Sequence, residues 1–234
     1  MYLPLQIDSL AVATETLIDG QPIEKTLSIW ELVSTGGVGG NIIMITLTLM
    51  LFLALYLYFE RLFAINAASK IDGTFMNQIK DNIVNGRIEA AKLLCAQSKS
   101  PVARLTEKGI SRIGKPLEDI NTAIENAGKI EIYKLEKNAN MLATISGAGP
   151  MIGFLGTVIG MILAFHEMAS GGGQVDVGAL AGGIYTAMTT TVAGLIVGII
   201  AYMGYNHLVM KTDKVVHQME ANAVDFLDLL NEPS

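Results

Sequence analysis

The stretch GIYTAMTTTVAGLIVGII, residues 183–200, contains no charged residue, yet it carries four threonines and a small side chain at every third or fourth position. It belongs to an uncharged window that runs from Val177 to Asn206, and two similar windows cover Leu32–Phe59 and Asn138–Phe165. An α-helix needs about 20 apolar residues to cross the hydrocarbon core of a bilayer. Each window is long enough, so the sequence predicts an all-α membrane protein with three transmembrane helices.

The composition agrees with a membrane protein. The chain of 234 residues is 51% hydrophobic and only 16% charged. A set of buried soluble helices is the alternative, but such helices are rarely this long and free of charge. A net charge of −6 argues against a nucleic-acid partner, and we expect no enzymatic activity, no cofactor and no metal. The single cysteine, Cys95, excludes an internal disulfide and is predicted to be a buried thiol.

The positive residues predict how the spans are oriented. Thirteen of the 16 Lys and Arg residues lie between Arg61 and Lys137, and Lys211 and Lys214 follow the third window. Lys and Arg are enriched in the cytoplasmic segments of membrane proteins. The long central segment and the C-terminus are therefore predicted to be cytoplasmic, with the N-terminus on the outside.

The predicted segments alternate between the two sides of the membrane. They are a periplasmic N-terminus with a short interfacial helix (1–40), the first span (41–59), a cytoplasmic helical region (60–140), the second span (141–165), a periplasmic loop (166–180), the third span (181–206) and a cytoplasmic C-terminal helix (207–234). A capping box from Ser28 to Glu31 beside Trp30 predicts the interfacial helix. The glycines at 36–40 are expected to break the chain before the first span. The first positive residue is Lys25, so we expect a stable anchor rather than a signal peptide.

Helical spacing dominates the central segment. The patterns predict short helices over 87–97 and 102–113, separated by Ser98–Pro101. Apolar positions from Leu117 onward keep the same spacing up to the second span, and the tail after the third span is amphipathic. The second and third membrane helices are therefore predicted to extend into a cytoplasmic helical bundle.

The three spans differ in the size of their side chains. The first is bulky on every face, which indicates contact with lipid. The other two carry stripes of small residues, and small residues let membrane helices approach closely. The stripe glycines that we predict to pack the helices are Gly149, Gly153, Gly156 and Gly160 on the second span and Gly183, Gly194 and Gly198 on the third.

The threonines have two interpretations. A hydroxyl inside a helix often bonds back to a carbonyl one turn earlier and is then inert; we expect this of Thr46, Thr48, Thr186 and Thr189. Thr157 and Thr191 lie on the small-residue stripes at similar depth, so they are candidates for a polar ring that lines a proton path, with Thr186 and Thr190 as further lining candidates. No span contains an acid, a lysine, an arginine or a histidine, although proton channels normally mark their path with such a group. If the protein moves protons, the titrating group must come from elsewhere.

Three motifs resemble one known family. GFLGTVIGMILAF (153–165) and TTTVAGLIVGIIAYMGYN (189–206) are similar to the second and third spans of the MotA/TolQ/ExbB proton channel family. GRIEAAKLLCAQSKSPVARLTEKGISRIG (86–114) is similar to a cytoplasmic pattern of its ExbB and TolQ branch. Three spans and the chain length resemble ExbB most.

The resemblance implies a homopentamer in the bacterial inner membrane. It also implies a single-span partner of the ExbD or TolR type, whose intramembrane aspartate carries the proton, and a periplasmic linker of the TonB type. The pore threonines of the family match Thr157 and Thr191. Many family members have a glutamate at the position of Thr186, so any role of that glutamate does not transfer to this chain.

Four alternatives share part of this pattern. A TolQ-like subunit for envelope integrity or a gliding motor would use the same chemistry with another client. A non-conducting scaffold would need the stripes but no proton path. A secondary transporter would need inverted repeats with matching helix breaks, and Pro150 has no counterpart in the third span. An intramembrane enzyme would need an activated nucleophile at membrane depth, which no His or Asp there supplies.

Overall fold

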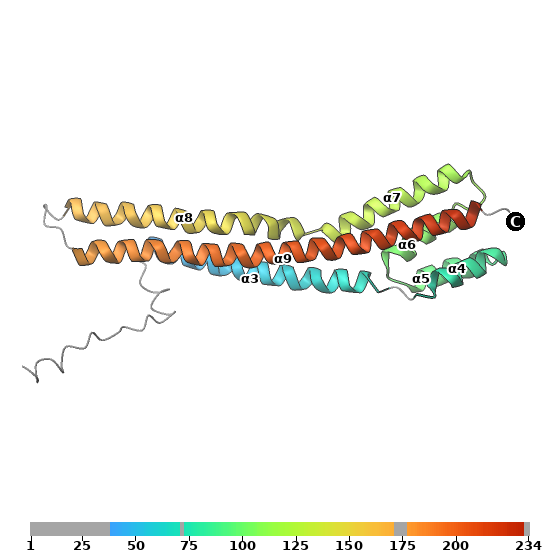
Figure 1. The fold of residues 1–234 in the computed structure, drawn as a ribbon, viewed down its shortest axis with the longest axis horizontal. Coiled ribbons are helices and arrows are strands. Elements are labelled where there is room, and N and C mark those ends of the chain that lie inside the picture. The colour runs from blue at the N-terminus through green and yellow to red at the C-terminus, as the bar shows by residue number, and fades with distance from the viewer. Residues whose placement is uncertain (1–37, 71–72, 171–176, 232–234) are drawn as a thin grey trace, which may run out of the picture. The chain divides into compact units, whose positions relative to one another are not determined.

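The computed structural model describes residues 38–70, 73–170 and 177–231, and these form helices without any strand. Figure 1 gives the helix labels used below. The helices are α3 (Val38–Ala68), α4 (Phe75–Val84), α5 (Ile88–Gln97), α6 (Pro101–Ile110), α7 (Leu117–Glu136), α8 (Ala139–Ser170) and α9 (Val177–Asn231). The predicted interfacial helix and residues 171–176 of the predicted periplasmic loop lie outside the described residues, whereas 166–170 belong to α8 and 177–180 to α9.

Within the described residues, three helical stretches are long and apolar enough to cross a membrane: Gly39–Ala68, Leu117–Ser170 and Leu180–Asn231. The predicted all-α membrane fold is therefore confirmed. With 55 residues, α9 is about 80 Å long at 1.5 Å per residue. Because a bilayer core is only about 30 Å thick, much of α9 must lie beyond it.

The membrane part consists of α8 and α9 side by side, with α3 packed against both (Figure 1). The face of α3 toward the pair carries buried Ile43, Leu47, Ala54 and Leu57. Its other faces expose bulky apolar residues, as expected for a helix in lipid; Phe52, for example, is 66% exposed.

The first helix begins earlier than its sequence suggested. We expected the glycines at 36–40 to break the chain, but α3 already includes Gly39 and Gly40. A methyl group added at Gly39 would lie 3.5 Å from Ile159 on α8, and one at Gly40 would lie 3.2 Å from Thr186 on α9. The distance at Gly39 is an ordinary contact, whereas the one at Gly40 is tight, so Gly40 lets the start of α3 approach α9 closely. Neither glycine ends the helix.

The second membrane helix does not run unbroken into the bundle, because α7 ends at Glu136 and α8 begins at Ala139. Between them Asn138 has a positive φ of 66°, a conformation that Asn tolerates better than most residues. The guanidinium of Arg61 on α3 donates a 3.2 Å hydrogen bond to the carbonyl of Lys134 in the last turn of α7. Helix ends leave such carbonyls without a partner in the helix, so Arg61 stabilises the end of α7.

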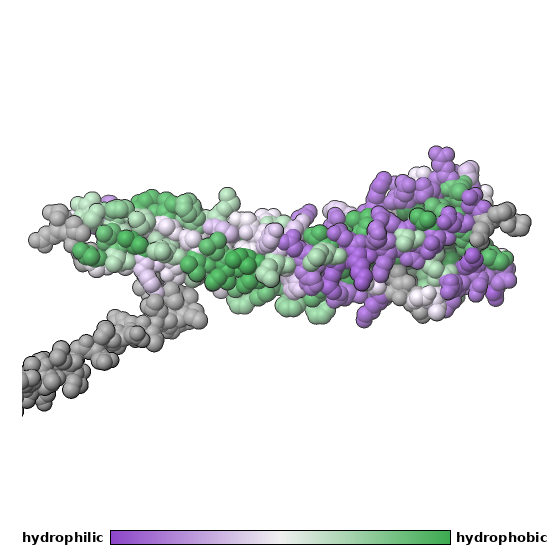
Figure 2. Space-filling model, viewed as in Figure 1, coloured by the Kyte–Doolittle hydropathy of each residue, from purple (hydrophilic) through white to green (hydrophobic). Residues whose placement is uncertain are grey.

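The water-facing bundle combines α4 to α7 with the end of α9, and its surface is largely hydrophilic on the face shown in Figure 2. Both α5 and α6 lie close to the predicted 87–97 and 102–113. Ser100 caps α6 by accepting a 3.2 Å hydrogen bond from the amide of Ala103. Phe226, fully buried near the end of α9, packs against Gly109 of α6, which attaches the tail of α9 to the bundle.

A buried acid joins two helices of this bundle. Glu131 of α7 is 5% exposed and forms ion pairs with Arg104 of α6 and, at 2.7 Å, with Lys134. A buried carboxylate is costly unless it is paired and hydrogen-bonded. Arg104 and Lys134 therefore offset the cost of burying Glu131, and the pair with Arg104 joins α6 to α7.

Candidate functional site

The contact between α8 and α9 is made by glycines. All seven stripe glycines face the other helix of the pair. A methyl group added at Gly153 would lie 2.8 Å from the carbonyl oxygen of Thr190, and one at Gly198 would lie 2.7 Å from the ring of Pro150. Such distances are shorter than any normal contact, so the two backbones touch at these levels. Neither helix can carry a larger residue there without moving away from the other.

Three hydroxyls lie within this contact. Thr157 of α8 donates to the carbonyl of Ala187 at 2.8 Å, and its Oγ1 lies 2.5 Å from Oγ1 of Thr191. Thr191 of α9 also reaches the carbonyl of Gly153 at 3.1 Å. Thr190 lies 2.8 Å from the carbonyl of Ala187 and 3.3 Å from that of Gly153. We call Thr157 and Thr191 the threonine pair.

The two hydroxyls of the threonine pair make more hydrogen-bond contacts than they have protons to donate. Two hydroxyls share three contacts, with each other and with the carbonyls of Ala187 and Gly153, and each hydroxyl donates only one proton. Either Thr157 donates to Ala187 and accepts from Thr191, or Thr191 donates to Gly153 and accepts from Thr157. In both arrangements one carbonyl has no hydroxyl donor and the other still accepts one. If that remaining carbonyl contact is given up, one hydroxyl can donate to a group beside the pair while the bond between the two threonines is kept.

The other threonines behave differently. Thr46, Thr48 and Thr189 each donate to the carbonyl four residues earlier, at 2.8–2.9 Å, as expected. Thr190 is only 1% exposed, enclosed between α8 and α9. The structure does not bring Thr186 to the threonine pair, since Thr186 lies against Gly40 of α3.

The threonine pair lies on the side of the α8–α9 contact away from α3. Ile159 of α8 and Thr186 of α9 face α3. At about 100° per residue, Thr157 is rotated by about 200° from Ile159, and Thr191 by about 140° from Thr186. Both threonines are half-buried. Beside them, the exposed apolar residues Phe154, Val158, Met188 and Leu195 form a surface that we call the open face.

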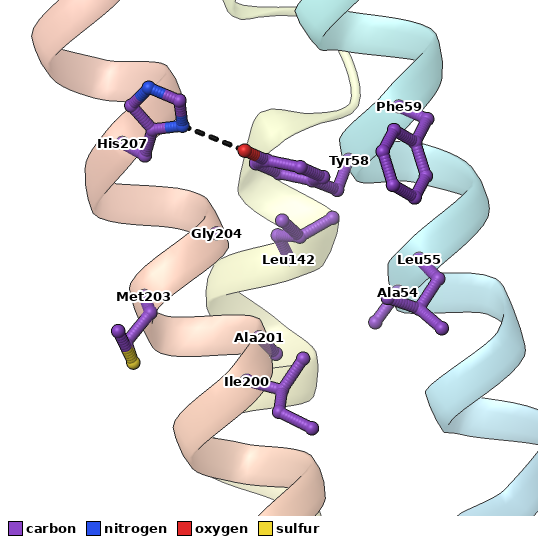
Figure 3. Close-up of a pocket in the computed structure, with 10 residues that line it drawn as sticks. All are labelled: Ala54, Leu55, Tyr58, Phe59, Leu142, Ile200, Ala201, Met203, Gly204 and His207. Atoms are coloured by element: carbon purple, nitrogen blue, oxygen red, sulfur yellow. Dashed lines mark hydrogen bonds between the residues drawn. The ribbon is translucent and has the colours of Figure 1, made fainter.

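A cavity on the α3 side of the α8–α9 pair is apolar, unlike the threonine pair. It measures about 420 Å³ and is lined by apolar residues of α3, α8 and α9. At its edge the hydroxyl of Tyr58 lies 2.7 Å from Nδ1 of His207 (Figure 3). The threonine pair does not line this cavity. His207 follows directly after the uncharged window that ends at Asn206, and through this contact it joins the ends of the apolar parts of α3 and α9.

The sequence pattern gave Thr190 a different place from the one the structure shows. The stripe predicted for the third span included Thr191, and Thr190 was only a further lining candidate, whereas the structure encloses Thr190 between α8 and α9. Its spacing gave a usable signal, because Gly183, Ala187, Thr190 and Gly194 follow at intervals of four, three and four residues, which keeps one helix face.

Three apolar helices, two of them joined by glycines around a cluster of hydroxyls, define a polytopic membrane protein rather than a soluble bundle. Residues 97–221, more than half of the chain, match the model of the MotA/TolQ/ExbB proton channel family. The chain therefore belongs to this family, which is a family of channel proteins and not of enzymes.

Two relatives illustrate the similarity. The chain is 25% identical over 220 residues to the Tol-Pal system protein TolQ of Pseudomonas aeruginosa, covering 87% of this chain and 93% of that one. It is 29% identical over 135 residues to a biopolymer transport protein ExbB homolog of Methanothermobacter thermautotrophicus, covering 58% of this chain but only 47% of the relative. A solved chain described as "Structure of C. jejuni MotAB" aligns with 97% of this chain and 92% of that one at a TM-score of 0.46 and 15% identity.

Proposed function

We propose that this chain is the ring-forming channel subunit of a motor in the bacterial inner membrane that is driven by the proton motive force. In this proposal, a single-span partner of the ExbD type supplies the proton-carrying aspartate. The energy then passes to a TonB-like periplasmic linker and powers transport across the outer membrane.

The observation that carries this proposal is the threonine pair on an apolar, open face. Neither 138–165 nor 177–206 contains an Asp, Glu, Lys, Arg or His residue, so the chain alone has no carboxylate, amine or imidazole that could bind and release a proton at this depth. The hydroxyls can nevertheless stabilise one that is brought to them. A carboxylate from another chain is the simplest complement.

The physical chemistry of a carboxyl group in a membrane gives the mechanism. A neutral aspartic acid can cross the apolar open face, whereas a bare carboxylate is very costly to bury. Thr157 and Thr191 would offer the ionised form a hydroxyl donor, because the pair always has one carbonyl contact to release. The partner would thus pause at the threonine pair until it is protonated, and each proton that crosses 100 mV supplies about 2.3 kcal/mol.

The open face also supports assembly into a ring. A single chain leaves Phe154, Met188 and Leu195 without a protein partner. In a closed ring, these residues would face the neighbouring subunits and a central partner. We propose five copies, with the N-terminus in the periplasm and the C-terminus in the cytoplasm. The segment 60–140 is then cytoplasmic, in keeping with its thirteen Lys and Arg residues between Arg61 and Lys137.

The test replaces the partner's intramembrane aspartate by asparagine in cells that carry both proteins. We expect the complex to assemble in normal amounts and to lose all work that depends on the proton motive force, because asparagine keeps the size but cannot titrate. Undiminished work with the asparagine partner would refute the two-component mechanism.

A second candidate is a TolQ-like role in envelope integrity, which the similarity to TolQ along most of both chains supports. Deleting this chain distinguishes the two. Loss of outer-membrane uptake with an intact envelope favours the TonB client, and sensitivity to detergents with normal uptake favours the Tol client. A non-conducting scaffold would show neither a dependence on the proton motive force nor an effect of the threonines.

A further inference from the structure

A polar cavity lies where α7 meets α8, and we call it the inner cavity. Its volume is about 160 Å³. Three helices meet around it, and each contributes a polar group. These polar groups belong to Glu136 at the end of α7, Asn140 at the start of α8, and Tyr205, Thr212 and Asp213 of α9.

The inner cavity lies on the same helix faces as the threonine pair. Its apolar wall includes Ala139, 18 residues before Thr157, and Val209, 18 residues after Thr191. Eighteen residues are about five helical turns, so each residue is in line with its threonine, about 27 Å further along the helix. The threonine pair and the inner cavity are therefore two levels of one face of the α8–α9 pair.

The side chain of Thr212 is placed to bind a molecule inside the inner cavity. It is only 5% exposed and lines the cavity. A threonine inside a helix usually bonds back to a carbonyl one turn earlier, and Thr106 does so to Val102 at 2.9 Å. Among the described residues the Thr212 hydroxyl has no such partner. The side chain lines the cavity, so its hydroxyl is free to bind a water molecule or another polar occupant there.

The charges around the cavity are mostly acidic. The titratable groups that line it are Glu136 from α7 and Tyr205 and Asp213 from α9, while α8 contributes only Ala139 and Asn140. Nearby cations are held elsewhere: Lys134 pairs with Glu131 at 2.7 Å, and Lys211 bonds to Asn66 at 2.8 Å. Lys137 and Lys214 are sequence neighbours of the two acids, but they do not line the cavity.

We propose that the inner cavity is the port through which protons leave the channel, with Glu136 and Asp213 as proton acceptors and Thr212 as the ligand of a bridging water. This inference rests on the proposed proton-channel function. The O–H bond of the partner's aspartic acid breaks, and its proton passes to water bound in the inner cavity. An O–H bond then forms on Glu136 or Asp213, and the proton passes from there to bulk water. No electron is transferred.

The exposure of the two acids fits this role. Glu136 and Asp213 are both exposed, so they can exchange protons with bulk water, whereas the buried Thr212 can hold water at the inner end of the face. A carboxylate at the exit takes up a proton from the channel faster than hydroxide ions do, because hydroxide is dilute near neutral pH. The acids therefore prevent proton release from limiting the cycle.

The experiment measures proton flux through liposomes that hold the complete complex with its single-span partner. Glu136→Gln combined with Asp213→Asn is expected to reduce the flux by at least about tenfold, which is less than the factor of about 10²–10⁴ that a positioned acid or base contributes to catalysis. Thr212→Val is also expected to reduce the flux. The matched control is Glu118→Gln with Asp225→Asn, which removes two exposed acids of the same helices outside the cavity and is expected to leave the flux unchanged.

A second measurement separates a proton port from a structural role. Formate, a small weak acid, should restore the flux of the double variant when it is added on the side of the inner cavity, and Glu136→Asp with Asp213→Glu should keep most of the flux. The port is refuted if the wild-type complex conducts and the double variant conducts equally well. It is also refuted if the double variant is slow and neither formate nor the conservative exchange restores it. A wild-type complex that conducts nothing refutes the proposed function itself.

Discussion

Replacing Thr157 by valine tests the threonine pair, because valine keeps the shape of threonine and removes its hydroxyl. Thr157 makes two hydrogen-bond contacts across the helix pair, to Ala187 and Thr191. Hydrogen bonds between membrane helices average about 0.6 kcal/mol, so the stability of the pair should fall by only about 1 kcal/mol. The glycine contacts remain, and the complex is expected to assemble.

The effect on function should be much larger than the effect on stability. A hydrogen bond to a charged group contributes about 1.5–3 kcal/mol. Each 1.36 kcal/mol changes a rate tenfold, so we expect the complex to work about 10- to 100-fold more slowly. The assay compares proton-driven work per assembled complex in Thr157→Val, Thr157→Ser and Thr46→Val.

The two comparison variants make the result interpretable. Thr157→Ser keeps the hydroxyl and should retain most of the activity. Thr46→Val removes a hydroxyl that bonds only within its own helix, to Ile42 at 2.9 Å, and should change little. Full activity of an assembled Thr157→Val complex would show that the threonine pair only packs the helices.

Three further predictions concern packing, the thiol and topology. Gly194→Leu should prevent the α8–α9 contact and abolish assembly, because even a methyl group there would lie 2.8 Å from the Cα of Gly153; normal assembly in detergent would contradict this. Burial and the nearby Glu107 carboxylate raise the pKa of Cys95 from 9.0 to about 12, so a thiol reagent at pH 8 should label Cys95 only after unfolding. Because the folded chain holds the thiol proton more tightly, this contribution to stability should be complete below about pH 9 and should decline toward pH 12, an effect that Cys95→Ala should lack in denaturant titrations. In intact spheroplasts an impermeant maleimide should label Gln174→Cys, and it should label Lys115→Cys only after permeabilisation; the reverse pattern would overturn the orientation.

The sequence predicts most of the membrane part because lipid imposes strong rules. A charge-free stretch of sufficient length indicates a span, and small residues at helical spacing indicate where spans touch. The spacing alone thus assigns Gly153 and Gly194 to helix packing. Thr157 and Thr191 were expected at similar depth, and the structure brings their hydroxyls into contact.

Other features depend on contacts that a linear pattern does not contain. The break at Asn138 lies within continuous helical spacing, with no glycine or proline to mark it; it depends on tertiary contacts such as the bond from Arg61 to Lys134. The inner cavity brings Glu136 and Asp213 together across 77 residues of sequence. The sequence shows both acids, but only the helix arrangement shows that they share a cavity.

Proton flux through liposomes that contain this chain alone tests the central claim most directly. The chain has no Asp, Glu, Lys, Arg or His residue in 138–165 or 177–206, so an imposed pH gradient should decay little faster than in empty liposomes. Adding the single-span partner should allow flux, and the partner with asparagine in place of its aspartate should not. Rapid, selective proton flux through the purified chain alone would show that the path lies wholly within it and would contradict the account.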